Sequence, residues 1–184
     1  SVSSHPASAS SLTLTIHIEL LCMVMSVTAP RETCGHGEWT MTDLQIRKIP
    51  FDFDDHVPFV WNRENPEFAI MCNAVGVLAI AFEKFVVQAC KEALPLITDP
   101  AVREETEAFM RQEGQHARMH RAHIRALIRQ YPGVQEVLDE AVASFDELTA
   151  TKPLAFRLAY TADLEATFTP IFKLFLDHHR TLYE

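Results

Sequence analysis

The chain has 184 residues, of which 48% are hydrophobic and 22% are charged, a balance typical of one packed globular domain with or without a tail. Sixteen Lys and Arg residues against 25 Asp and Glu residues give a formal net charge of −9, which excludes nucleic acid as an expected partner because phosphate backbones are repelled. Neither a GxGxxG nor a GxxxxGK[ST] string occurs, so the common nucleotide-binding loops are excluded as well.

The cysteines and the longest apolar stretch indicate in which cellular compartment we expect the protein. The chain has four cysteines (Cys22, Cys34, Cys72 and Cys90) and no CxxC pair, which favours a reducing compartment over a disulfide-rich scaffold. The longest uninterrupted apolar stretch of the most hydrophobic segment, residues 74–82, is shorter than the roughly 20 residues that cross a bilayer. We therefore expect a cytoplasmic protein without a stable membrane span.

The first 65 residues predict little regular structure. Residues 1–40 begin with a Ser-rich run and are interpreted as a disordered or non-native tail, so Cys34 and His36 within them are not expected to bind a metal. Residues 41–65 predict an irregular arm, because two prolines interrupt a short acidic segment. We expect this arm to be pinned by Phe51, Phe53, Phe59 and Trp61, and we interpret the acidic group Asp52, Asp54 and Asp55 beside His56 as a solvated loop.

Residues 66–184 predict a helical domain. Pro66 suits a first helical position, and Asp99 followed by Pro100 is a typical helix start. Pro95 and the Tyr131–Gly133 segment predict helix ends. No segment alternates with a period of two, so the fold class is all-α. The predicted helices are 67–94, 100–130, 134–149 and a last one from Pro153 to about His179, bent at Pro170.

The second predicted helix carries polar residues on the face that we expect to be buried. Residues in alternating steps of four and three share one helix face. Here that face is Val102, Thr106, Phe109, Glu113, His116, His120, His123 and Leu127. The flanking row Met110, Ala117 and Ile124 is apolar, which indicates that this side faces inward. Glu113 and His116 therefore occupy positions where a helical bundle would place leucine.

The first and last predicted helices each interrupt an apolar stripe with one glutamate. In the first helix the stripe is Cys72, Gly76, Ala79, Glu83, Val86, Cys90 and Leu94. In the last helix it is Leu154, Leu158, Thr161, Glu165, Phe168, Phe172, Phe175 and His179. Burying one unpaired carboxylate costs several kcal/mol, so three of them in one interior need a common partner.

A metal ion is the partner that we favour. Carboxylate oxygens and imidazole nitrogens bind iron and manganese, and the Glu113–His116 spacing of three places both side chains on one face. The alternatives are that Glu83 pairs with an arginine of the second helix and that the histidines are hydrogen-bonded residues of the core. His120 and His123 are interpreted as structural residues or as residues that support the ligands, and Asp163 is expected to point to another side.

These motifs resemble a known family. AFEKF around Glu83, RQEGQHARMHR around Glu113 and His116, and DLEATFTP around Glu165 are similar to the bacterial predicted metal-dependent hydrolases, over roughly residues 45–184. In its ligand pattern, that family resembles ferritin-like di-iron carboxylate proteins. The resemblance implies a ferritin-like helical bundle with Glu83, Glu113, His116 and Glu165 as metal ligands. It also implies two iron ions in the complete protein, with manganese as the alternative.

The chain departs from that pattern at its end. A ferritin-like site uses a second Glu-x-x-His pair from a fourth core helix, and no such pair occurs before Glu184. His178 and His179 lie about 20 Å along the helix from Glu165 and cannot replace it. We therefore expect a C-terminally incomplete bundle that lacks its last core helix.

Three functions remain open at this stage. The preferred one is a metal-dependent hydrolase acting on an unidentified small molecule; its rival is a di-iron oxidase or oxygenase. In either enzyme, the substrate space could be lined by Phe82, Phe109, Phe168 and Phe172, although packing in the core is the role that we favour for each. The third is a non-catalytic helical interaction module, whose exposed bundle groove would favour a homodimer. No catalytic residue beyond the metal ligands is assigned.

Overall fold

The computed structural model describes Phe53 and residues 56–183, which form five α-helices and one short 3-10 helix. No strand occurs in this part of the chain, so the all-α class is confirmed. The tail of residues 1–40, with Cys34 and His36, lies outside the described residues, as do Phe51 and the acidic group Asp52, Asp54 and Asp55. The helices are α2 (Pro66–Ala93), η2 (Leu94–Leu96), α3 (Pro100–Gln130), α4 (Gly133–Thr151), α5 (Leu154–Asp177) and α6 (His179–Tyr183).

The ends of the helices follow from local chemistry. The Asn65 side chain accepts a hydrogen bond from the Phe68 amide, so that α2 starts with a capped first turn and Pro66 at its first position. The Asp99 side chain accepts hydrogen bonds from the amides of Ala101 and Val102 at the start of α3. These caps agree with the starts predicted from the sequence, and Pro170 lies inside α5 as expected.

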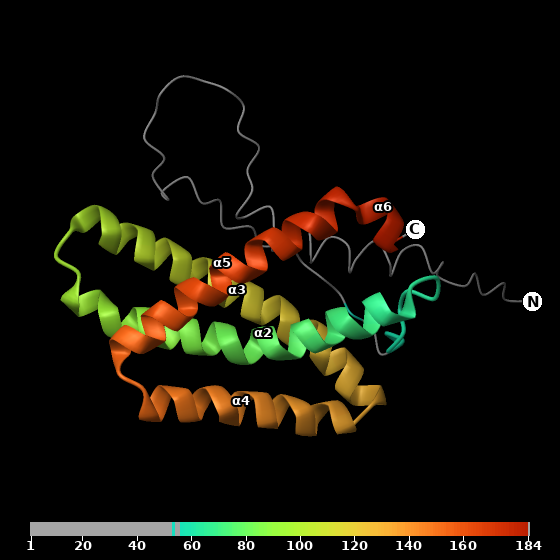
Figure 1. Cartoon of the computed structure of the whole chain (residues 1–184). Coiled ribbons are helices and arrows are strands. Elements are labelled where there is room, and N and C mark those ends of the chain that lie inside the picture. The colour runs from blue at the N-terminus through green and yellow to red at the C-terminus, as the bar shows by residue number, and fades with distance from the viewer. Residues whose placement is uncertain (1–52, 54–55, 184) are drawn as a thin grey trace, which may run out of the picture.

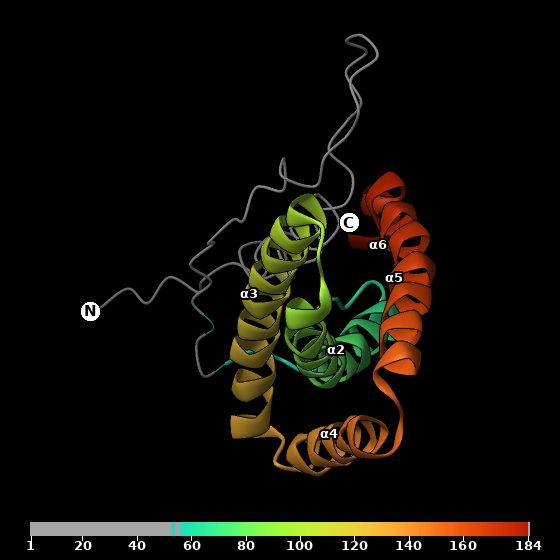
Figure 2. The same cartoon turned by 90° about the vertical axis from the view of Figure 1, so that its left-hand side faces the viewer.

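Helix α2 is the central element of the bundle. Figures 1 and 2 show α3 and α5 on two sides of α2, with α4 running along a third side. Helix α2 contacts all three of these helices, which explains why its sequence is apolar on nearly every side. Its interior contacts include Val77, Ile80, Phe82, Phe85 and Val86.

The composition of α2 also satisfies the length and hydropathy test for a membrane span. The segment Pro66–Leu96 has a window of mean hydropathy 1.9, and 56% of that window is buried inside the protein. A helix at the centre of a bundle passes the same test, and here α2 carries the buried polar residues Asn73 and Glu83. The expectation of no stable membrane span stays a prediction.

The described part of the arm before α2, Phe53 and residues 56–65, contains no helix or strand, and its aromatic residues pack against the helices. Trp61 is buried beside Phe68, and its indole N–H donates to Asn73 Oδ1 at 3.2 Å. The Asn73 amide in turn donates to the carbonyl of Phe59 at 2.8 Å. Phe53 packs against the His123 ring at 5.2 Å between centroids. The anchoring predicted for Phe53, Phe59 and Trp61 is confirmed, and His56 is exposed.

Candidate metal centre

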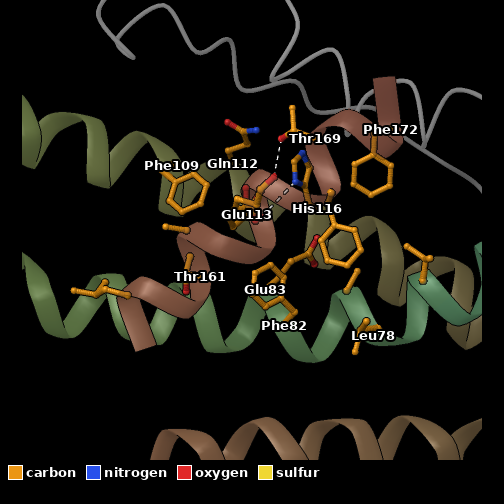
Figure 3. Close-up of a pocket in the computed structure, with 16 residues that line it drawn as sticks. Leu78, Phe82, Glu83, Phe109, Gln112, Glu113, His116, Thr161, Thr169 and Phe172 are labelled. Carbon is orange, nitrogen blue, oxygen red and sulfur yellow. Dashed lines mark hydrogen bonds and ion pairs between the residues drawn. The ribbon is translucent and has the colours of Figure 1, made fainter. Parts of the chain in front are cut away.

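Acidic and histidine side chains from three helices converge beside the middle of α2. Glu83 comes from α2, and Glu113 and His116 come from α3 (Figure 3). Glu165 comes from α5 and lines the same cleft. Glu83, Glu113 and His116 are only 3%, 4% and 7% exposed, although none of them is an apolar residue. They are buried because they occupy positions on the apolar stripes of the sequence, which face the interior of the bundle.

Three of these residues form a compact group, which we call the Glu–Glu–His cluster (Glu83, Glu113 and His116). One ligand atom from each lies within 4.8 Å of the other two. The helical spacing of three residues places His116 Nδ1 3.6 Å from Glu113 Oε2, and packing of α2 against α3 brings Glu83 to the same point. Metal–ligand bonds of about 2.0–2.2 Å keep two ligand atoms at most about 4.4 Å apart. A small movement of the side chains is therefore enough for one ion to contact all three.

Glu165 lies at the edge of the same site. It is partly buried and lines one cleft together with the Glu–Glu–His cluster. Burial and the charge of Glu113 raise the pKa of Glu165 to about 7, while His116 lowers it. The structure thus brings all four predicted ligands to one cleft, with three of them in mutual contact range and Glu165 across from them on α5.

The chemistry of the cluster fits a cation. Burial raises the pKa of Glu83 well above its usual range, and the charges of Glu113 and Glu165 raise it further, against a smaller opposing effect of Arg121. Glu83 Oε2 is buried and has no hydrogen-bond partner among the described residues. A buried, unpartnered carboxylate oxygen is costly, and a bound metal ion supplies the missing positive charge and the missing contact. The residues present therefore fit a metal ion.

A second histidine of α3, His120, lies beside the Glu–Glu–His cluster without belonging to it. His120 Nε2 lies 3.7 Å from Glu83 Oε1, which is beyond hydrogen-bond distance. Burial lowers the pKa of His120 to about 3, with smaller contributions from His116 and His123, so its ring is neutral. The backbone of Gly76 lies close to this ring, since a Cβ at Gly76 would meet His120 Nδ1 at 3.5 Å, an ordinary van der Waals distance.

His123 and Asp163 lie away from the ligands. His123 is 4% exposed, packs against Phe53, and has a pKa lowered by burial to about 4. Its Nε2 has no partner within the described part of the chain. Asp163 is exposed on the outer side of α5, as the sequence spacing predicted.

An apolar cleft of about 450 Å³ opens beside the ligands, between α2, α3 and α5. Its walls include Phe82, Phe109, Phe168 and Phe172, the four residues considered for a substrate space. Figure 3 shows Phe82, Phe109 and Phe172 near Glu83 and Glu113. Two polar residues of the cleft, Gln112 and Thr161, were not assigned to the site from the sequence. Thr161 had one usable signal, because it lies one helical turn before Glu165 on the same stripe.

The match to known proteins follows this geometry. A sequence model of the family described as "predicted metal-dependent hydrolase" matches residues 45–184. The chain belongs to this family. The match includes all four predicted ligands and every helix of the described residues. No curated protein and no solved structure matches the chain.

Proposed function

We propose that this member of the metal-dependent hydrolase family is an enzyme whose metal centre consists of Glu83, Glu113, His116 and Glu165. The observation that carries the proposal is the buried Glu–Glu–His cluster, whose ligand atoms lie within 4.8 Å of one another. Iron is the favoured metal and manganese the second choice, because the ligands are carboxylates and imidazole without a thiolate. Cys72 and Cys90 do not add a thiolate ligand, because burial is the main cause that raises the pKa values of their thiols to about 12 and about 11.

We further propose a centre of the di-iron type. Glu113 would bridge two ions, and Glu165 would bind the second one from the opposite side of the cleft. The support is the position of Glu165 on the shared cleft and its electrostatic coupling to Glu83 and Glu113. Glutamates and Glu-x-x-His pairs that project inward from several helices form the carboxylate centres of ferritin-like bundles, the fold that we expect here.

In the proposed hydrolysis, the bound ions supply Lewis acidity and a water molecule of lowered pKa. Glu83, Glu113 and His116 would hold the ions in a fixed position, because each of these side chains is buried and extends from a packed helix. The aromatic walls exclude bulk water and hold the apolar part of a substrate. Gln112 is buried in the wall of the cleft, where its side-chain amide can donate a hydrogen bond to a polar group of the substrate.

The test is metal binding by the metal-stripped protein under nitrogen, titrated with iron(II) and separately with manganese(II). Wild type should bind iron(II) with micromolar or better affinity, and the Glu113→Ala, His116→Ala double variant should bind at least 100-fold more weakly. The matched control, Glu104→Ala with His178→Ala, removes the same residue types from exposed positions and should bind as wild type. Equal binding by the site variant and wild type would remove the metalloenzyme proposal. A Glu165→Ala variant that binds one ion where wild type binds two would support the di-iron type.

Oxygen chemistry is the second candidate, and a specific observation favours it. Four phenylalanine rings surround the carboxylates, and such dry walls protect an oxidising centre from water. The two candidates differ in what the loaded protein consumes. Oxygen uptake by the iron(II)-loaded protein, absent from the Glu113→Ala, His116→Ala variant, would favour the oxidase. Hydrolysis of ester or amide substrates by the manganese-loaded protein under nitrogen would favour the hydrolase.

A further inference from the structure

The apolar cleft has walls that suit a hydrocarbon rather than a polar ligand. Besides the four phenylalanines, Val75, Leu78 and Leu158 line it. Its volume of about 450 Å³ lies within the range of about 300–1,000 Å³ that small organic ligands occupy in proteins. Among the described residues that line it there is no Lys or Arg, so a negatively charged group would have no protein cation to pair with.

Thr161 provides one polar contact in this apolar space. Its side chain is 5% exposed, and its hydroxyl has no hydrogen-bond partner among the described residues. In Figure 3 it extends from α5 toward α2, inside the cleft. A buried hydroxyl without a partner is unfavourable, so a ligand that hydrogen-bonds to it gains free energy on binding.

Other helical threonines of this protein show that the open hydroxyl is not a general property of the residue. Thr106, Thr149, Thr151, Thr167 and Thr169 each donate to the carbonyl four residues earlier, at 2.7–2.9 Å. This local bond is the usual one for a threonine inside a helix. Thr169 also lines the cleft, but its hydroxyl is occupied by the Glu165 carbonyl. Thr161 does not make the equivalent bond, and its hydroxyl is available to a ligand.

We infer that the cleft binds an elongated, uncharged molecule with a hydrocarbon body and one hydroxyl or carbonyl group, which hydrogen-bonds to Thr161. The body lies along the phenylalanine walls. Anionic molecules are disfavoured, because Glu83, Glu113 and Glu165 face the same space. The inference rests on the proposed function in one respect: members of this class whose carbonyl belongs to an ester or amide would be the substrates of the metal centre. The binding itself does not require the metal.

The test uses the full-length, metal-stripped protein and displacement of the neutral fluorophore Nile red by 1-octanol, octane and octanoate at pH 8. We expect 1-octanol to displace the dye and octanoate to be at least tenfold weaker. The Thr161→Val variant keeps the shape of the side chain and removes the hydroxyl. It should weaken 1-octanol binding roughly five- to tenfold, the worth of one neutral hydrogen bond, and leave octane binding unchanged. Equal 1-octanol affinity of Thr161→Val and wild type would overturn the role of Thr161.

A second pair of variants tests the cleft itself. Val75→Phe fills the cleft two turns from Glu83 and should weaken 1-octanol and octane alike. Ala74→Phe, at the neighbouring exposed position, is the matched control and should bind as wild type. Failure of both 1-octanol and octane to displace the dye would overturn the inference. Loss of Nile red binding at protein concentrations at which dimers form would also overturn the inference, because a second copy of the chain would then occupy the cleft.

Metal titration of the same preparations keeps the two proposals apart. Metal-stripped wild type should bind 1-octanol and, in a separate titration, iron(II). Thr161→Val should still bind iron(II) as wild type does. Loss of 1-octanol binding with intact iron(II) binding would overturn the substrate class alone, whereas intact 1-octanol binding without iron(II) binding would overturn the metal centre alone.

Discussion

Glu83 Oε1 of α2 lies 3.7 Å from His120 Nε2 of α3, while Glu83 Oε2 has no partner in the described part of the protein. The neutral imidazole and the carboxyl group are therefore neighbours that stop just short of a hydrogen bond. Ionisation of Glu83 by a bound metal would strengthen the attraction for an imidazole N–H and close this gap. Such contacts behind a ligand orient it and tune its affinity.

The first prediction concerns this contact. His120→Ala should lower the affinity for iron(II) about 10- to 100-fold, the usual effect of removing a residue that orients a metal ligand. His120→Gln retains an N–H donor and should restore part of the affinity. The measurement is the iron(II) titration of metal-stripped protein. His179→Ala, an exposed histidine on α6, is the control and should bind as wild type. If His120→Ala kept full affinity, the contact would be packing alone.

Much of the site could be predicted from the sequence because helix periodicity decides which residues share a face. Glu83, Glu113 and His116 fall on apolar stripes, and all three are buried as that position requires. The start of the α3 stripe was predicted wrongly: Val102 was assigned to the inner face and is 47% exposed. Periodicity is a property of one helix, and it does not say where a neighbouring helix ends.

The free hydroxyl of Thr161 could not be predicted in this way. Its position on the α5 stripe was visible, but the choice between a local bond and an open hydroxyl depends on the rotamer that packing selects. The same holds for Asn73, whose side chain links α2 to Trp61 and Phe59 of the arm. These polar contacts join segments whose mutual placement is set by tertiary packing, which no local pattern encodes.

The second prediction concerns the acid stability of the metal-free protein. Burial lowers the pKa of His123 from 6.5 to about 4. Between these values the unfolded chain binds a proton that the folded chain does not, so stability is present above about pH 6.5 and is lost as the pH falls toward 4. From pH 7 to pH 5 the loss due to His123 is about 2 kcal/mol. His123→Phe, which keeps an aromatic ring against Phe53, should lose that much less in urea unfolding over this range. Equal losses in the two proteins would contradict the buried neutral state of His123.

The third prediction has the opposite sign. Burial and Glu113 raise the pKa of Glu165 from 4.5 to about 7, so the unfolded chain releases a proton in this range that the folded chain retains. The contribution of Glu165 to stability is present below about pH 4.5 and is lost as the pH rises through 7. Because Glu165 is partly exposed, we expect about 1–2 kcal/mol rather than the full value.

Urea unfolding of metal-free wild type and Glu165→Gln at pH 5 and pH 8 measures this effect. Glu165→Gln should be the more stable protein at pH 8 and nearly equal to wild type at pH 5. Saturating manganese(II) should reverse the order at pH 8, because the ion binds the ionised carboxylate of wild type and stabilises the folded state. A Glu165→Gln variant that is less stable than metal-free wild type at pH 8 would mean that Glu165 is ionised and paired instead.

The fourth prediction compares two ion pairs that hold the outer helices to α2. Arg157 of α5 is 5% exposed and pairs with Glu92 of α2, and its Nε and Nη1 groups have no other partner within the described residues. Lys84 of α2 pairs with Asp146 of α4 at 2.6 Å, and both of those side chains are substantially exposed. Removing the acid from each pair has different consequences, because only Arg157 is left with its charge buried.

Glu92→Gln should therefore cost about 2 kcal/mol of the free energy of unfolding, less than the 3–5 kcal/mol of a fully buried pair because Glu92 itself is half exposed. Asp146→Asn should cost at most about 1 kcal/mol, the range of exposed pairs. Urea unfolding at 50 mM and 500 mM salt separates them further, since salt screens the exposed Lys84–Asp146 pair more than the buried guanidinium. Because Arg157 lies one turn before Thr161, loosening α5 in Glu92→Gln should also weaken 1-octanol binding, while Asp146→Asn leaves it unchanged. Equal costs for the two variants would show that Arg157 reaches solvent and does not anchor the cleft wall.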